Sequence, residues 1–119
     1  MDEKTCILEL KEKVKKFCEE RDWDQFHNAK ELAIGIVTEG SELLQHFRFK
    51  SEEEVDRLLR SDKREDISEE MADLLFFILR LAQRYSIDLS IELEEKLKKI
   101  AEKYPIEKAK GSNKKYSEF

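Results

Sequence analysis

The segment from Met71 to Ala82 is apolar at nearly every position, with Asp73 and Arg80 as its only charged residues. A helix that is apolar on almost all sides is typical of the centre of an assembly. Three glycines and one proline in 119 residues provide few turns for a multi-stranded sheet. We therefore expect an all-α fold of four helices, a single domain over residues 1–119, and helices shared between the subunits of a homo-oligomer.

Helical spacing of apolar residues places the expected elements. Residues 61–66 are all polar and are expected to be a connection. The tail over 105–119 is polar and lysine-rich, which is typical of a disordered terminus. The expected helices cover 3–20, 29–47, a short segment over 51–60, 67–85, and a last one that ends near Lys103 before Pro105.

Capping residues support three of these helix starts. Asn28 can cap the second helix. Ser51 followed by Glu54 has the spacing of a capping box. Asp88 or Ser90 can cap the last helix, and the sequence leaves both open.

Two acidic pairs interrupt apolar stretches. Glu39 and Glu42 form one pair, and Glu70 and Asp73 form the other. Residues three apart on a helix are neighbours on one face, and Glu39 falls within the apolar arc that includes Ile36. Acids rarely occupy such a stripe without a partner. Two unit charges about 5 Å apart cost roughly 3 kcal/mol at an effective dielectric of 20. A divalent cation is the simplest compensation if the four side chains converge.

The ligand chemistry of the pairs favours a hard cation. Carboxylates supply only oxygen ligands, which suit Mg²⁺ or Mn²⁺ rather than zinc. A di-iron bundle needs Glu-x-x-His on two helices, and none occurs; Asp24 to His27 is the nearest pattern. His46, four residues after Glu42, is interpreted as structural or as a neighbour of the ligands. Nucleophile elbows and phosphate-binding glycine loops are absent. The alternative is that these acids are surface charge on a non-catalytic helical interaction module.

Charge and hydropathy limit the partners and the location. The net charge of −5 argues against binding to nucleic acid, which needs a basic surface. No apolar run reaches the roughly 18 residues of a membrane span. Cys6 and Cys18 are expected to be reduced thiols, because one helix would hold them about 18 Å apart. We expect a cytoplasmic protein.

Residues 21–28 hold the only tryptophan inside a polar connection. Trp23 and Phe26 either plug one end of the helical core or form an aromatic lip that stacks on a flat ligand. The residues alone leave both interpretations open.

The acidic pattern, Glu-x-x-Glu followed by Glu-x-x-Asp, resembles the signature of the MazG-like all-α nucleoside triphosphate pyrophosphohydrolases. The dCTP pyrophosphatase branch is the part of that superfamily that the chain resembles most. Phe49 stands where these proteins usually have tryptophan, and Ile100 where they usually have asparagine. The matching segments run over almost the whole chain: Glu20 to His27, Glu42 to Lys50, Glu69 to Leu75, Lys103 to Pro105, and Ala109 to Tyr116.

The resemblance implies a reaction and a set of site residues. It implies that Glu39, Glu42, Glu70 and Asp73 hold Mg²⁺ or Mn²⁺ and carry catalysis. Water would attack the α-phosphorus of a (deoxy)nucleoside triphosphate, such as dCTP or a modified cytosine nucleotide, and release pyrophosphate. The nearly continuous apolar segment from Met71 to Ala82 favours a homotetramer built as a dimer of dimers, with a homodimer as the alternative. The substrate-binding residues that it implies are Trp23, His27, Phe49, Phe77, Lys96, Lys114 and Tyr116.

Overall fold

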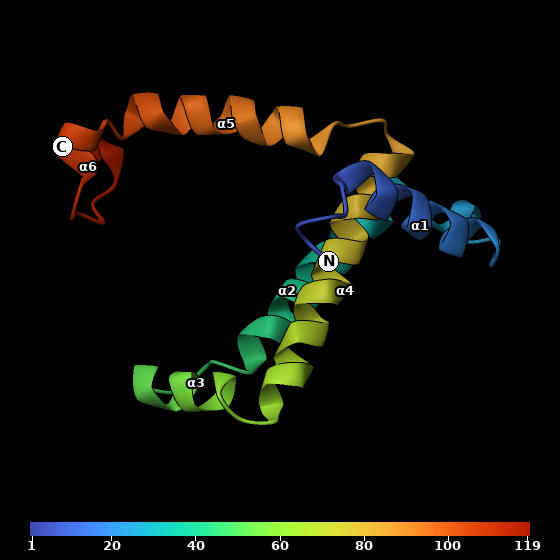
Figure 1. Ribbon diagram of the computed structural model, residues 1–119, viewed down its shortest axis with the longest axis horizontal. Helices are drawn as coiled ribbons and strands as arrows, with labels where there is room; N and C mark the ends of the chain where they lie inside the picture. The colour runs from blue at the N-terminus through green and yellow to red at the C-terminus, as the bar shows by residue number, and fades with distance from the viewer. The chain divides into compact units, whose positions relative to one another are not determined.

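All 119 residues are described by the computed structural model, and every element in it is a helix (Figure 1). The expected all-α class is therefore confirmed. No helix combines the length and the apolarity that crossing a membrane requires. The four long helices are α1 (Ile7–Glu19), α2 (Ala29–Gln45), α4 (Lys63–Arg84) and α5 (Leu89–Lys103). The shorter elements are α3 (Glu52–Leu59), α6 (Ile106–Ala109) and the 3₁₀ turns η1 (Asp24–Phe26) and η2 (Tyr116–Glu118).

The expected caps are present. The side chain of Asn28 accepts a hydrogen bond from the Glu31 amide at 2.9 Å and so caps α2. Ser51 and Glu54 form the full capping box of α3. Asp88 caps α5 by accepting from the Ile91 amide at 2.9 Å, which settles the choice that the sequence left open.

Three boundaries differ from the sequence expectation. The third long helix begins at Lys63, so residues 63–66 are helical rather than part of a connection. These residues form the first turn of α4, which is polar, and the apolar positions of the helix begin only after it. Asp62 precedes the helix but makes no side-chain capping bond that would mark its start. The first helix begins at Ile7 rather than at residue 3. The tail over 105–119 contains α6 and η2 rather than being without structure.

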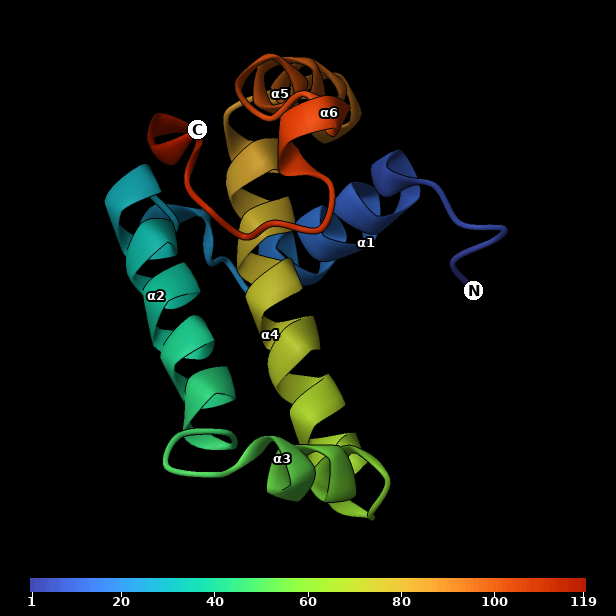
Figure 2. The same ribbon diagram turned by 90° about the vertical axis from the view of Figure 1, so that its left-hand side faces the viewer.

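The chain divides into two compact units, Met1–Ser86 and Ile87–Phe119. The single domain expected over 1–119 stays a prediction. In the first unit α4 contacts α1, α2 and α3. Figures 1 and 2 show α2 and α4 side by side and antiparallel, joined through α3 at one end. The buried side chains of this unit are Cys18, Leu32, Ile67, Leu79, Arg80 and Ala82.

The chain alone does not cover its central helix. Met71 of α4 is 58% exposed and Leu75 is 43% exposed. On α2, Val37 is 68% exposed. The half of α4 that carries the second acidic pair therefore keeps an open apolar side, unlike the buried half around Leu79.

The second unit is held together by aromatic rings. The ring of Tyr104 lies edge-on to those of Tyr116 and Phe119, with centroids 5.9 and 5.7 Å away. The ammonium group of Lys103 lies 4.8 Å from the centre of the Tyr116 ring. These contacts explain why the polar tail has structure.

Candidate metal centre

The acidic pairs meet between the two antiparallel helices. Glu39 comes from α2, and Glu70 and Asp73 come from α4. One carboxylate oxygen from each of these three residues lies within 4.8 Å of the others. Glu42, one turn after Glu39, is exposed and interacts with both Glu39 and Glu70 by hydrogen bonding and by charge. The predicted convergence is therefore present, with three acids at its centre and Glu42 beside them.

The cluster is electrostatically unfavourable without a cation. One oxygen of Glu39 and one of Glu70 are buried and accept no hydrogen bond. Burial first, then the hydrogen bond and charge of Glu42, and then the charges of Asp73 and Glu70 together raise the pKa of Glu39 to about 7. Burial and Glu42 also raise the pKa of Glu70. Buried carboxylate oxygens without partners are costly, so the protein alone leaves this site uncompensated.

The donor set fits a hard divalent cation. The converging ligand atoms are all carboxylate oxygens, the donors that Mg²⁺ and Mn²⁺ prefer. A cation there would neutralise the mutual repulsion and supply partners to the orphaned oxygens of Glu39 and Glu70. Glu39, Glu70 and Asp73 are thus the residues that would hold it.

His46 lies beside this centre rather than in it. Its Nε2 is 3.7 Å from Oε1 of Glu70. The polar contact with His46 lowers the pKa of Glu70, which opposes the larger effects of burial and Glu42. The separation is longer than a hydrogen bond, so His46 is a close neighbour of a candidate ligand, and a role for it in orienting that carboxylate stays a prediction.

The two expected base-stacking aromatics lie at opposite ends of α2. Trp23 precedes the helix and Phe49 follows it. A helix of 17 residues is about 25 Å long, so the two rings do not face one ligand within a single chain. This separation is the main feature of the site that the sequence motifs did not reveal.

The surroundings of the two rings differ. Trp23 is half-buried, with its ring edge-on to Phe17 at 5.7 Å and to His27 at 5.8 Å. Trp23 therefore packs against the core as the first interpretation of residues 21–28 expected, whereas Phe26 is 61% exposed. Stacking of either ring on a ligand stays a prediction.

Phe49 is 91% exposed and has a left-handed backbone, with φ of 64°. The guanidinium of Arg48 lies 4.4 Å from its ring centre. A left-handed backbone at a residue other than glycine costs about 1 kcal/mol or more. Such strained residues are more common at functional sites than elsewhere.

The remaining expected substrate contacts fall into two groups. Phe77 lies on α4 one turn after Asp73, and its ring packs against Gly35 of α2. Lys96, Lys114 and Tyr116 belong to the second unit, with Lys96 exposed on α5 and Tyr116 packed on Tyr104.

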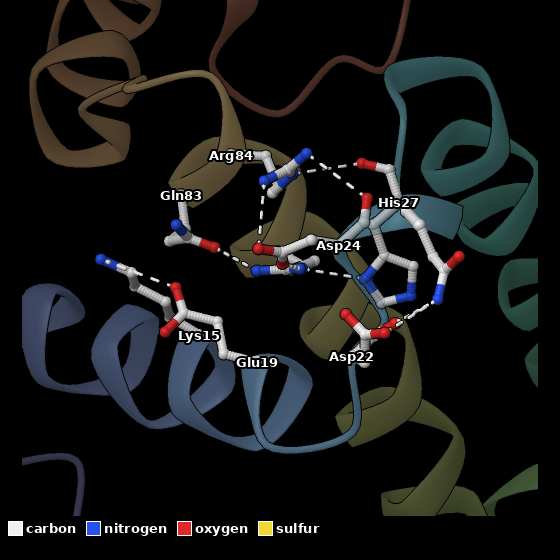
Figure 3. Close-up of polar contacts among 9 residues, drawn as sticks. Lys15, Glu19, Asp22, Asp24, His27, Gln83 and Arg84 are labelled. Carbon is white, nitrogen blue, oxygen red and sulfur yellow. Dashed lines mark hydrogen bonds and ion pairs between the residues drawn. The ribbon is translucent and has the colours of Figure 1, made fainter.

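A buried arginine is the feature that sequence reasoning missed. Arg80 on α4 is fully buried, and its guanidinium donates to Asp24, His27 and Gln83. Figure 3 shows these three side chains together with Arg84, which also binds the segment of η1. The available signal was a lone arginine inside an apolar run, since buried charges are rare without partners.

The raised pKa values predict how stability depends on pH. In the metal-free protein, the free energy of unfolding should fall as pH rises from 4.5 to about 7, because folded Glu39 keeps its proton over that window. Glu70 acts in the same direction. His27, with a pKa lowered from 6.5 by burial and by Arg80, acts in the opposite direction. The comparison of wild type with Glu39→Gln cancels the His27 contribution.

Thermal unfolding in EDTA at about pH 5 and about pH 7.5 measures this effect. At the higher pH, the Tm of wild type should fall further below that of Glu39→Gln than it does at the lower pH. Added Mg²⁺ should bind ionised Glu39 and so stop the Tm of wild type from falling, relative to that of Glu39→Gln, at the higher pH. An equal difference at both pH values without metal would contradict the raised pKa of Glu39.

Comparisons with known proteins identify similar chains. The sequence profile described as the MazG-like family matches residues 34–119. The proteins named dCTP pyrophosphatase 1 of Rattus norvegicus and Homo sapiens are 33% and 34% identical over 104 residues. That alignment covers 87% of this chain but 61% of each relative, so the chain spans less than two thirds of their length.

One solved structure is similar along most of both chains. It is a pyrophosphatase from Archaeoglobus fulgidus, with a TM-score of 0.77 and 33% sequence identity. The superposition covers 83% of this chain and 92% of the other.

Proposed function

This chain belongs to the MazG-like family, and from that premise we propose that it is a metal-dependent nucleoside triphosphate pyrophosphohydrolase. The proposed substrates are (deoxy)nucleoside triphosphates, and the products are a nucleoside monophosphate and pyrophosphate. The names of the relatives and of the solved structure, which are all pyrophosphatases, support this reaction class.

The observation that carries the proposal is the geometry of the acidic centre. Oxygens of Glu39, Glu70 and Asp73 converge within 4.8 Å from two helices. The buried oxygens of Glu39 and Glu70 lack any partner in the protein. Acids that were only surface charge would be solvated and spread apart, so the geometry favours an enzyme over a non-catalytic module.

The proposed reaction breaks the anhydride bond between the α- and β-phosphates after attack of water on the α-phosphorus. A divalent cation supplies charge neutralisation for the triphosphate, which an acidic chain cannot provide alone. Glu39, Glu70 and Asp73 hold the cation, and His46 orients Glu70. Glu42 is exposed beside the three ligands, where its carboxylate can accept a proton from the attacking water.

Cytosine nucleotides are the proposed preferred substrates. The relatives named dCTP pyrophosphatase 1 support that choice. Trp23 and Phe49 are the proposed stacking surfaces for the base, with His27 beside Trp23. Two departures bear on the preference: Phe49 offers a smaller ring than the usual tryptophan, and Ile100, 40% exposed on α5, offers no amide.

We also propose a homo-oligomer, a dimer or a dimer-of-dimers tetramer. An open apolar groove lies over the acid-bearing half of α4, lined by Leu43, Met71, Leu74, Leu75 and Ile78, with Asp2, Ser68 and Ala72. A second copy of the chain would cover this apolar surface. Sedimentation of a stable monomer at micromolar concentration would contradict this assembly.

A panel of nucleoside triphosphates with Mg²⁺ tests the proposed function. Each reaction is assayed separately for pyrophosphate and for inorganic phosphate. We expect equal amounts of pyrophosphate and monophosphate, no direct release of phosphate, the highest kcat/KM for dCTP, and complete loss of activity in EDTA. Release of inorganic phosphate alone, or no turnover of any triphosphate, would contradict the proposal.

A further inference from the structure

Arg80 makes a specific contact with the imidazole of His27. Its Nε donates to Nδ1 of His27 at 2.9 Å, and its Nη1 donates to Oε1 of Gln83 at 2.6 Å. Its Nη2 donates to Oδ1 of Asp24. Each nitrogen of this fully buried guanidinium therefore has a partner, and one of those partners is a ring nitrogen (Figure 3).

The contact fixes where the His27 proton lies. A guanidinium has donors only and no acceptor. Nδ1 of His27 must therefore present a lone pair to Arg80, and the single proton of the neutral ring must be on Nε2. The doubly protonated ring is disfavoured by burial, by the charge of Arg80 and by that of Arg84, and these lower its pKa against the opposing charge of Asp24.

Simple anchoring of the η1 turn does not account for Arg80. Arg84 already anchors that turn, since it donates to the carbonyl oxygens of His27 and Asp24 at 3.3 and 3.4 Å. Its Nη1 also lies 3.6 Å from Oδ2 of Asp24, which is 44% exposed. A buried ion pair does not by itself explain why a charged residue is present, because apolar side chains of the same volume often give the folded protein equal or greater stability. Among the contacts that Arg80 makes with the η1 segment, the one that Arg84 does not duplicate is the hydrogen bond to the imidazole of His27.

The ring that Arg80 orients lies next to the proposed base-stacking residue. The centroids of His27 and Trp23 are 5.8 Å apart, with the rings inclined at 61°. His27 is only half-buried. A base stacked on Trp23 would thus have its edge near the free Nε2–H of His27.

We propose that Arg80 is a positioning residue that holds His27 as an Nε2–H donor to an acceptor on the nucleobase. This rests on the proposed function of the chain as a nucleotide hydrolase. Cytosine, thymine and uracil all carry an acceptor at O2, but at N3 cytosine has an acceptor and thymine and uracil have an N–H donor. The acceptor that we propose for the Nε2–H of His27 is therefore N3 of cytosine. A fixed donor at that position disfavours thymine and uracil, so Arg80 contributes to specificity without touching the substrate.

Two charge-conserving variants test this role. Arg80→Lys keeps the positive charge but loses the donor to Nδ1. Arg84→Lys is the matched control, because it also keeps its charge and loses guanidinium contacts to η1, but none to the ring. The KM for dCTP should rise about three- to tenfold in Arg80→Lys, as expected for one lost hydrogen bond. The kcat for dCTP should stay within about twofold, whereas the KM for dTTP should stay the same or fall, because a released ring can accept from the N3–H of thymine. Arg84→Lys should behave as wild type within about twofold for both nucleotides.

The tautomer is read directly by long-range ¹H–¹⁵N NMR of the free chain. His27 and His46 are the only histidines, so the spectrum is simple. At pH 7.5, above the ordinary imidazole pKa of 6.5, wild type and Arg84→Lys should show neutral His27 with its proton on Nε2, and Arg80→Lys should lose that single state. A wild-type spectrum with the proton on Nδ1, or with both nitrogens protonated, would overturn the proposal without any variant.

The two proposals fail in different ways. The positioning role fails if His27 has another tautomer, or if Arg80→Lys changes dCTP and dTTP kinetics equally. The proposed function fails if wild type releases no pyrophosphate from any triphosphate. Because the spectra need no nucleotide, the state of His27 is decided independently of turnover.

Discussion

Glu39→Gln is expected to lower pyrophosphate release by on the order of 10³-fold or more while the chain stays folded. The glutamine side chain has nearly the same shape but one weaker oxygen ligand and no charge. Glu39 is one of the three converging ligands, and it has a buried oxygen with no partner other than the proposed cation. Losing this ligand should remove the metal-dependent part of the transition-state stabilisation.

The same Glu39→Gln substitution that lowers activity should raise the stability of the metal-free protein. In EDTA at neutral pH, Glu39→Gln should unfold at a higher temperature than wild type, because it removes one charge from the cluster that raises the pKa of Glu39. Added Mg²⁺ should raise the Tm of wild type and have little effect on that of the variant. This pattern separates a lost ligand from a damaged fold.

Glu31→Gln is the matched control for this experiment. Glu31 lies on the same helix, is exposed, and makes the same change in net charge. It should keep wild-type kcat and the wild-type response to Mg²⁺. Pyrophosphate release by Glu39→Gln at the rate of this control would refute the assignment of the ligands.

Gly35→Ala is expected to destabilise the first unit by about 1–3 kcal/mol. A Cβ at this position would lie 2.6 Å from two atoms of the Phe77 ring and 2.8 Å from a third. The ring is half-buried and packs edge-on to Phe76, so the ring must leave its present position or α2 and α4 must separate to admit the methyl group. We expect a fall in Tm of roughly 5–15 °C. Because Glu39 follows Gly35 by one turn, the affinity for Mg²⁺ should fall as well.

Gly40→Ala, on the same helix, is expected to stabilise the protein rather than destabilise it. No atom lies within 4 Å of a Cβ built at Gly40. Alanine is the better helix former, so this variant should gain about 0.5–1 kcal/mol. Circular dichroism during thermal unfolding of both variants measures the difference. If Gly35→Ala were as stable as Gly40→Ala, the close packing of Phe77 on Gly35 would be wrong.

A second variant tests the cause of the clash. Phe77→Leu should be destabilising alone, but it should cost less in the Gly35→Ala background because the smaller side chain leaves room for the methyl group. Strictly additive effects on the free energy of unfolding would indicate that the alanine acts elsewhere.

The metal centre could be predicted because it depends on local spacing. Residues three apart share a helix face, so each acidic pair is readable from the chain alone. The apolar positions around Glu39 then orient α2 toward α4. This reasoning identified the residues that the structure brings together, and it needed no knowledge of the connection between the helices.

Features that depend on distant pairs could not be predicted in the same way. Asp24 and Arg80 are 56 positions apart, and nothing in the local sequence indicates that one will bind the other. The order in the tail has a similar origin, because the ring of Tyr116 packs on Tyr104. The start of α4 was placed too late for a different reason: the polar residues 61–66 were interpreted as a connection, although residues 63–66 form the solvated first turn of the helix.

The length of α2 has a consequence for dilution experiments. This helix is about 25 Å long and separates the segment that carries Trp23 from the one that carries Phe49, whereas the acids of the metal centre converge within one chain. If a base stacks on both rings, a dissociated monomer retains its cation affinity but has only one wall for the base. Specific activity and discrimination among bases should then fall together as the protein concentration drops, while metal titration curves stay the same.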